Sequence, residues 1–418
     1  MASLYKIFFP LLFVAALFSG CDEFGGKGSG NEDSGEDSSV LPNIKPFAKG
    51  ETVSRTLLVY LMAENSISKD LKDDFDEIKN AAYDLPDDVR LFVYFDNSDA
   101  TRLPALYQYH PYNNRLVENV VYEFEEDVCS SDTAVLGKVL DMVFEEYPTK
   151  AFDLVLGSHA DGWISYQKTS PLNRTIGIDN EKNTYSDVIT TTIEVKELAE
   201  LLVRMPVKVD RLMFDACLMQ GVEVAYALRD VADWIIASPA EIPAYGAPYD
   251  KVVPEFFNAA SGVEGIMYEY KKSYDDKEYA ALISAVNTSY MQELADVTCQ
   301  YVEEYFNTNS ANNYSACLAY VPGKAPAYYD MNSVMKKILD EDDYAEWKAV
   351  FDKAVPYSMV SNSRMVWSQK AYRLVEIGEE CGAVSAYFPQ SKSLNQLYNS
   401  DFQTTEWYSA AGWDVAGW

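Results

Sequence analysis

Short apolar runs alternate with amphipathic segments along most of the chain. The runs at residues 56–62, 90–95, 209–214 and 234–237 have the length and composition of buried strands. The segments at residues 64–83 and 132–147 carry apolar residues at helical spacing, and the second begins with a serine and aspartate cap. This alternation predicts a mostly parallel sheet covered by helices, an α/β fold.

The pattern changes at two other places. Two alternating runs flank the sequence PYNN within residues 106–125, which predicts a β-hairpin. Beyond residue 248 the apolar spacing predicts longer helices at 290–306 and 331–340, with strands at 280–286, 315–321 and 384–388. We therefore expect a main domain at residues 56–261 and an accessory C-terminal α+β domain at 262–418 packed on the sheet.

A cysteine follows one of the predicted strands directly. The sequence VDRLMFDACLMQG, residues 209–221, runs from a buried strand through Cys217 toward a predicted helix at 219–230. The free N–H groups at a helix start favour an anion and would lower the pKa of the thiol. The alternative is that Cys217 is a small buried hydrophobe, as many cysteines at strand ends are.

A histidine occupies the matching position after another strand. In AFDLVLGSHADGW, residues 151–163, His159 follows an apolar strand as Cys217 does. Open α/β sheets place their sites at the carboxyl ends of parallel strands, so neighbouring strands would bring imidazole and thiol together. The chain has two histidines, and the other, His110, lies in the polar segment QYHPYNN. A Cys/His pair would therefore use His159.

These two strand ends, His-Ala-Asp-Gly-Trp and Asp-Ala-Cys, resemble those of the clostripain family of cysteine peptidases. The similarity extends over residues 56–389 and includes LLVYLMAENSI, ASPAEIPAYGAPYD and GAVSAYFP. It implies a caspase-like α/β/α sandwich in which His159 is the general base and Cys217 the nucleophile. Backbone N–H groups at Cys217 and Ala160 would hold the oxyanion, and alanine in place of the usual glycine after the histidine serves equally.

The resemblance also implies a substrate preference and a maturation step. In such enzymes the aspartate of Asp-x-Cys, here Asp215, helps to form a pocket for a basic side chain, and a carboxylate pairs better with arginine than with lysine. Asp215 could instead cap the following helix. Glu241 and Asp250 are open candidates for a second acid.

Relatives mature by cutting themselves in the loop between the two strands. In this chain the polar loop at 164–192 contains Arg174, the preferred cleavage site, with Lys168 and Lys182 as further candidates. The alternative is an uncleaved surface loop.

The first 55 residues have a different character. Residues 1–21 carry one lysine, an apolar core and small residues before Cys21, which resembles a bacterial lipoprotein signal ending at a lipidated cysteine. A cleaved secretory signal with an incidental cysteine is the alternative. Residues 22–55 are rich in glycine, serine and acid, and predict a flexible tether. We expect a lipid-anchored protein of the cell envelope, at the outer membrane or cell surface.

The net charge and the composition argue against nucleic acid as a partner and against a zinc site. The net charge is −31, and no basic cluster offers a surface for nucleic acid. Two distant histidines without HExxH leave no zinc set, and none of the six cysteines forms a CxxC pair. Cysteine peptidase chemistry needs no cofactor. Because clostripain depends on calcium, a structural calcium ion is kept as an open alternative. We expect a monomeric endopeptidase acting on proteins or peptides; the alternative is a non-catalytic binding lipoprotein derived from the same fold.

Overall fold

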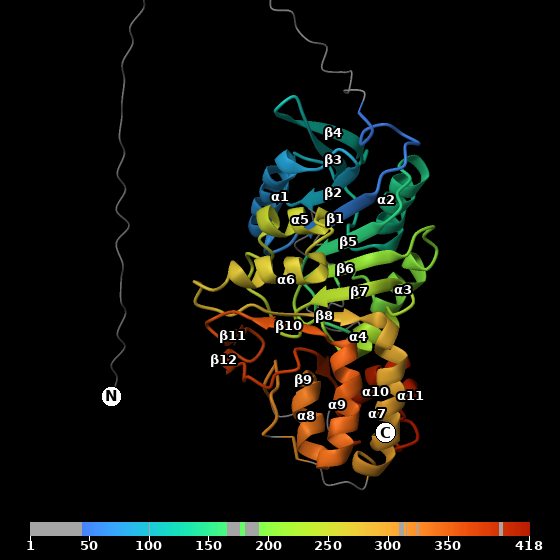
Figure 1. The fold of residues 1–418 in the computed structure, drawn as a ribbon, viewed down its shortest axis with the longest axis vertical. Helices are drawn as coiled ribbons and strands as arrows, with labels where there is room; N and C mark the ends of the chain where they lie inside the picture. Colours follow the sequence, from blue (N-terminus) through green and yellow to red (C-terminus); the bar gives the residue numbers. More distant parts are fainter. Residues whose placement is uncertain are drawn as a thin grey trace, which may run out of the picture. The chain divides into compact units, whose positions relative to one another are not determined.

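The computed structural model describes residues 44–99, 101–164, 176–179, 192–308, 313–314, 316–323, 326–392 and 396–418. Its centre is a nine-stranded sheet of order β10-β8-β7-β6-β5-β1-β2-β3-β4 (Figure 1). The five middle strands, from β7 to β2, are parallel, and two antiparallel strands flank them on each side. The strands are β1 (Arg55–Ala63), β2 (Val89–Asn97), β3 (Ala105–Tyr112), β4 (Arg115–Glu123), β5 (Phe152–Gly157), β6 (Val209–Asp215), β7 (Ala232–Ala237), β8 (Leu282–Asn287) and β10 (Tyr357–Val360).

The middle strands are apolar throughout because both faces of the sheet are covered. In β1, Leu57 and Val59 enter one hydrophobic core, whereas Leu58 and Tyr60 enter the core on the opposite face. This follows from the two-residue repeat of a strand, which sends successive side chains to opposite faces. The predicted α/β/α sandwich around a mostly parallel sheet is confirmed.

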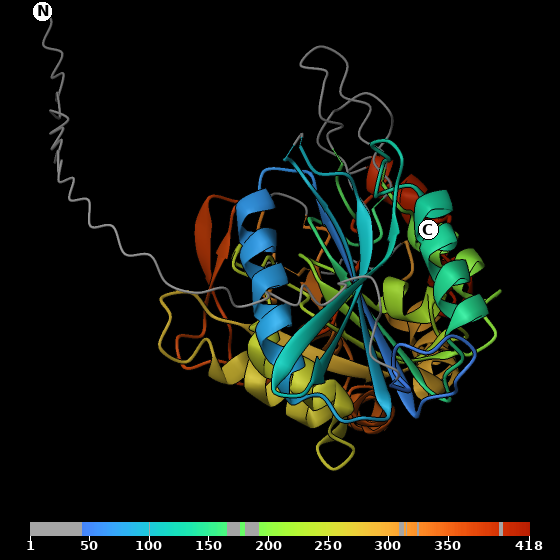
Figure 2. The same cartoon turned by 90° about the horizontal axis from the view of Figure 1, so that it is seen from above.

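Helices form a layer on each side of the sheet (Figures 1 and 2). The apolar residues of α1 (Ser68–Ala81), α5 (Tyr249–Phe257) and α6 (Gly262–Lys272) belong to the first core. The second core contains residues of the other main helices: α2 (Thr133–Glu146), α3 (Val195–Leu202), α4 (Val222–Ala227), α7 (Met291–Tyr305), α8 (Met331–Ile338), α9 (Glu341–Ala354), α10 (Gln396–Phe402) and α11 (Glu406–Ala410).

The C-terminal part of the chain both extends the sheet and covers it. Strands β8 and β10 continue the sheet beyond β7, and residues 41–418 form one unit. Two short pairs lie outside the main sheet: β11 (Met365–Ser368) with β12 (Arg373–Glu376), and β9 (Tyr329–Asp330) with β13 (Ser385–Ala386). The strand predicted at 315–321 is wrong; its described residues form a single bridge between Ala319 and Tyr329.

The start of the folded part lies earlier than the sequence predicts. Residues 44–54, assigned to the flexible tether, pack on the sheet, where Phe47 is buried against the ring of His110. The guanidinium of Arg90 in β2 donates hydrogen bonds to the carbonyl oxygens of Pro46 and Ala48. A buried arginine with backbone acceptors thus fixes this segment, and a tether would have to end before residue 44.

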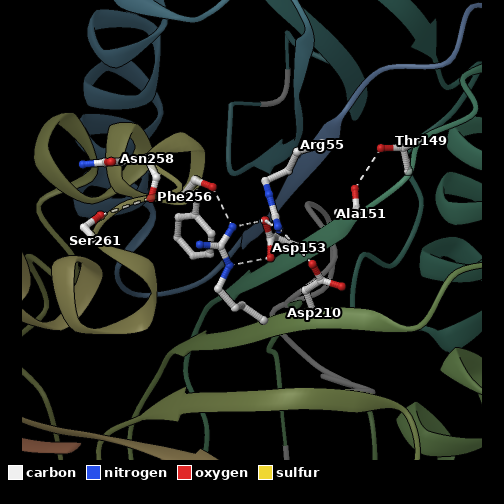
Figure 3. A network of polar contacts seen from close by, with 9 residues as sticks. Arg55, Thr149, Ala151, Asp153, Asp210, Phe256, Asn258 and Ser261 are labelled. Carbon is white, nitrogen blue, oxygen red and sulfur yellow. Dashed lines mark hydrogen bonds and ion pairs between the residues drawn. The ribbon is translucent and has the colours of Figure 1, made fainter.

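A buried ion-pair network joins three middle strands near their amino ends (Figure 3). Asp153 of β5 accepts hydrogen bonds from Arg55 of β1 at 2.7 Å and from Nε of Arg211 in β6 at 2.7 Å. Arg55 also pairs with Asp210, and Arg211 donates to the carbonyl of Phe256. Because Asp153 is fully buried and shared by two cations, the network favours the register of these strands. The candidate site lies at the opposite edge of the sheet, at the carboxyl ends of the same strands.

Candidate active site

The pairing of β5 with β6 places His159 and Cys217 at equivalent positions. The strands are parallel, and Gly157 of β5 is paired with Asp215 of β6. His159 and Cys217 each follow their paired residue by two positions, beyond the carboxyl ends of neighbouring strands. Both line one cavity of about 1190 Å³ at this edge of the sheet, together with Asp74, Asp215, Glu241 and Lys370. The two residues singled out by sequence therefore share a cavity.

The Cys217 thiol is half-buried and contacts the loop after β7. The backbone N–H of Ile242 donates a hydrogen bond to Sγ at 3.4 Å. Burial raises the pKa of the thiol from 9.0 to about 12, an effect that the Ile242 N–H only partly opposes. The expectation that a helix start lowers this pKa is wrong, since α4 begins five residues later, at Val222. Cys217 is therefore a neutral thiol at neutral pH.

The next residue, Leu218, adopts an unusual backbone conformation. Its φ is +63°, a left-handed value that costs a non-glycine residue about 1–3 kcal/mol. Its N–H donates to the carbonyl of Ala240, and its own carbonyl oxygen would lie 2.8 Å from a β-carbon added at Gly162. The turn after His159 and the turn after β6 therefore pack directly against each other, and Gly162 is needed for that approach.

His159 has a neighbour that the sequence did not indicate. Nε2 of His159 lies 2.9 Å from the hydroxyl oxygen of Ser66, in the loop between β1 and α1. Asp161, two residues after His159, forms an ion pair with Lys370 at 2.8 Å. Through this hydrogen bond to Nε2, the Ser66 hydroxyl is placed to orient the imidazole.

Asp215 is buried in the wall of the cavity and is wrapped by the loop before α5. The N–H of Ala247 donates to its Oδ2 at 3.0 Å, and a β-carbon at Gly246 would lie 2.5 Å from the same oxygen. The carbonyl oxygen of Gly246 accepts a hydrogen bond from Tyr274. Burial raises the pKa of Asp215 to about 6. Its carboxylate is part of the cavity wall and does not cap α4, which begins at Val222.

The two acids left open by the sequence have other contacts. Glu241 lines the cavity and accepts hydrogen bonds from the Ser368 hydroxyl at 2.7 Å and the Lys370 N–H at 3.2 Å. It therefore attaches the β11–β12 hairpin to the loop that follows β7. Asp250 lies in the first turn of α5 and pairs with Lys251, outside the cavity lining. A further acid in the lining, which the sequence did not indicate, is Asp74 of α1.

Ser158, which precedes His159, and the second histidine, His110, have structural roles. The Ser158 hydroxyl donates to the carbonyl of Met62 at 3.0 Å and accepts from the N–H of Ile178, inside the sheet edge. His110 lies in β3, where it is 1% exposed and far along the sheet from β5 and β6. Burial lowers the pKa of His110. Ser158 contributes to the lining of the cavity, but its hydroxyl is engaged in these two hydrogen bonds, and His110 does not line the cavity.

The structure describes the predicted oxyanion residue but not the predicted cleavage and lipidation residues. Ala160, whose N–H was expected to help bind an oxyanion, is buried and lines the cavity beside His159. The cleavage candidates Lys168, Arg174 and Lys182 lie outside the described residues, as does the lipidation candidate Cys21. Among the described cysteines, Cys217, Cys299, Cys317 and Cys381 are present as thiols.

One group of acids has the composition of a cation site. Carboxylate oxygens of Glu64, Asp96 and Asp127 lie within 4.8 Å of one another; Glu64 directly follows β1, and Asp96 lies one position before the end of β2. Calcium prefers such hard oxygen ligands, so these residues fit the structural calcium that the sequence left open. Calcium binding itself stays a prediction.

The chain is similar to known proteins over most of its length. Residues 59–418 match the model of the clostripain family. Clostripain from Hathewaya histolytica is 29% identical over 234 residues, a match covering 49% of this chain but only 42% of clostripain.

Two solved structures match nearly their whole length. A secreted C11 cysteine protease from Bacteroides thetaiotaomicron, solved with an irreversible peptide inhibitor, has a TM-score of 0.75 at 28% identity and covers 87% of this chain and 99% of its own. An inactive zymogen of a C11 protease from Parabacteroides distasonis has a TM-score of 0.72 at 26% identity, covering 89% and 99%.

Proposed function

The chain belongs to the clostripain family of cysteine peptidases, and on this premise we propose that it is a cysteine endopeptidase cleaving after basic residues, arginine before lysine. The observation that carries the proposal is the placement of His159, Cys217 and Asp215 on one cavity at the ends of neighbouring strands. Acyl transfer by a cysteine peptidase needs a thiol and an imidazole. A buried carboxylate beside them can bind a cationic side chain of the substrate.

The proposed mechanism starts from a neutral thiol. Because the pKa of Cys217 is about 12, His159 would take the thiol proton as sulfur attacks the scissile carbonyl carbon. The tetrahedral intermediate collapses to a thioester when the leaving amine accepts that proton from the imidazolium. Water, deprotonated by His159, then attacks the thioester, expels the Cys217 thiolate and releases the acid product. Backbone N–H groups at Ala160 and Cys217 are proposed to hold the oxyanion, each contributing about 3 kcal/mol.

A panel of matched peptides tests the proposed specificity. We expect the highest kcat/KM with arginine before the scissile bond, less with lysine, and little cleavage with leucine or aspartate. In Asp215→Asn the preference for basic residues should be lost while the melting temperature stays within a few degrees. Asp250→Asn is the matched control, because Asp250 lies outside the cavity, and it should keep the wild-type profile. Equal turnover of all four peptides by the wild type would refute the basic pocket.

We also propose that the enzyme cuts its own chain between β5 and β6. Support comes from the solved Parabacteroides distasonis relative, which is an inactive zymogen. Intact mass spectrometry should find two fragments in the wild type, produced by cleavage after Arg174 or, failing that, after Lys168 or Lys182, and one chain in Cys217→Ala. A fully active enzyme that remains uncut would refute the proposed self-cleavage.

Finally, we propose that the protein is exported and anchored by a lipid on Cys21. Support comes from the signal-like sequence and from the secreted Bacteroides thetaiotaomicron relative. Across the described part of the chain, the structure contains no helix long and apolar enough to cross a membrane. Metabolic labelling with a fatty acid should mark the wild type and not Cys21→Ser; equal labelling of both would exclude this anchor.

A further inference from the structure

Asp74 occupies a position where a charged residue is unexpected. On α1, an otherwise highly charged helix, Leu71, Phe75 and Ile78 form the buried stripe that faces the sheet. Asp74 lies within this stripe and is 3% exposed. Aspartate is almost never buried to this degree unless another group compensates its charge.

The group beside Asp74 adds to the electrostatic cost. Asp74 and Asp215 reach the same cavity from α1 and β6. Within the part of the chain that the structure describes, Oδ2 of Asp74 and Oδ1 of Asp215 are buried and have no hydrogen-bond partner. Burial, and then repulsion by Asp215, raise the pKa of Asp74 to about 10, while burial raises that of Asp215 to about 6. At neutral pH the pair therefore retains a proton.

Among the described residues, the side chains that act most strongly on this pair are acids and phenols, which carry no positive charge. These groups are Asp70, Asp73 and Glu77 on α1, Tyr249 on α5, Tyr270 near the end of α6 and Tyr274 just after it. Two buried carboxylate oxygens, on residues that line the cavity, thus have no hydrogen-bond partner among the described residues, although the phenol of Tyr249 lowers the pKa of Asp215. An occupant of the cavity that brings several N–H donors and one positive charge would satisfy both.

We propose that Asp74 and Asp215 together bind the guanidinium of a substrate arginine, each carboxylate accepting from a different edge of the group. This inference rests on the proposed function, and it adds a specificity residue that the Asp-x-Cys motif does not contain. A guanidinium presents five N–H donors in a planar fork and can contact two separate carboxylates, whereas the lysine ammonium is a compact charge with three donors. Asp74 would therefore set the preference for arginine over lysine.

Binding of the cation would also ionise the pair. A guanidinium between the carboxylates favours their charged forms, so the proton held by Asp74 leaves as arginine enters. Higher pH should accordingly favour arginine substrates. The ratio of kcat/KM for arginine to that for leucine isolates this effect, because the state of His159 and Cys217 is common to both substrates.

The experiment compares Asp74→Asn with Asp73→Asn in the full-length enzyme. Asp73 is the adjacent, exposed residue of the same helix and undergoes the same chemical change. Three peptides differing only in arginine, lysine or leucine before the scissile bond are assayed from pH 6 to 9. We expect Asp74→Asn to lower kcat/KM for arginine by roughly tenfold or more, for lysine by a smaller factor, and for leucine hardly at all.

The pH profile provides the second readout. In the wild type and in Asp73→Asn, the arginine-to-leucine ratio should rise with pH, and in Asp74→Asn the rise should be smaller. An Asp74→Asn enzyme with the wild-type arginine-to-lysine ratio would overturn the inference, as would an equal loss for all three peptides, which indicates a structural role. If Asp74→Asn does not fold, Asp74→Ser, with its smaller side chain, replaces it. A wild type that does not prefer basic residues would instead refute the proposed function itself.

Discussion

The hydroxyl oxygen of Ser66 lies 2.9 Å from Nε2 of His159. Ser66 belongs to the loop after β1, and His159 to the turn after the neighbouring strand β5, so the contact joins two adjacent strand ends. A hydrogen bond to one ring nitrogen restricts rotation of the imidazole and selects its tautomer. Ser66 is therefore a positioning residue for the proposed base.

Replacing Ser66 by alanine should lower kcat/KM without affecting the fold. A hydrogen bond of this kind contributes about 0.5–1.5 kcal/mol, which corresponds to a loss of up to roughly tenfold. The loss should appear in kcat more than in KM, since Ser66 orients the base and does not bind the substrate. Ser68→Ala is the matched control, because the Ser68 hydroxyl accepts from the N–H of Ser98 instead. Equal kinetics of the two variants would contradict the assignment.

The raised pKa of Cys217 predicts how the free enzyme reacts with iodoacetamide. The thiolate is the reactive form, and with a pKa of about 12 its fraction grows about tenfold per pH unit throughout the range 6–9. The alkylation rate of Cys217, followed by peptide mass spectrometry, should therefore rise steadily without a plateau. A rate that is constant across this range would instead indicate a stable thiolate–imidazolium pair before substrate binds.

Two glycines with positive φ provide a test of the loop around Asp215. A β-carbon at Gly246, whose φ is +44°, would lie 2.5 Å from Oδ2 of Asp215, whereas one at Gly262, whose φ is +56°, meets no atom within 4 Å. Both alanine variants carry backbone strain of about 1 kcal/mol. Only Gly246→Ala should displace the carboxylate, and we expect it to lose at least roughly tenfold in kcat/KM for arginine peptides. Similar kinetics of the two variants would show that the carboxylate position does not matter.

His110→Ala should leave activity unchanged and lower stability. The imidazole is 1% exposed in β3 and packs edge-on against Phe47 at a centroid distance of 6.1 Å. Removing it leaves a cavity, for which we expect a loss of about 2 kcal/mol in the free energy of unfolding, measured by denaturant titration. A large loss of kcat/KM at temperatures where the variant is folded would reopen the choice of base.

The sequence was sufficient for the parts of the fold that follow from periodicity. The buried runs at β1, β2, β6 and β7 and the stripe of α1 were predicted because a strand covered on both faces and a helix covered on one each leave a distinct pattern. The hairpin was predicted from PYNN, where Asn113 and Asn114 take the positive φ values of a tight turn.

Other features depend on contacts that no local pattern records. The helix after Cys217 was predicted to start at residue 219, but the backbone first follows the left-handed Leu218, whose N–H bonds to Ala240 of another loop. Because the helix therefore starts farther from Cys217, it does not lower the pKa of the thiol as predicted. Asp74 and Ser66 were missed because each joins the site from a different element, and a single aspartate on a charged helix or a serine in a loop carries no signal by itself.

The central claim is that Cys217, beside His159, is the nucleophile of this cavity. The most direct measurement is intact-protein and peptide mass spectrometry after incubation with a peptidyl arginyl acyloxymethyl ketone, which alkylates an attacking thiol. The account predicts a single adduct on Cys217 in the wild type, much slower labelling in His159→Ala, and no labelling in Cys217→Ala. An adduct of the same yield in Cys217→Ala, or labelling of His159→Ala at the wild-type rate, would contradict it.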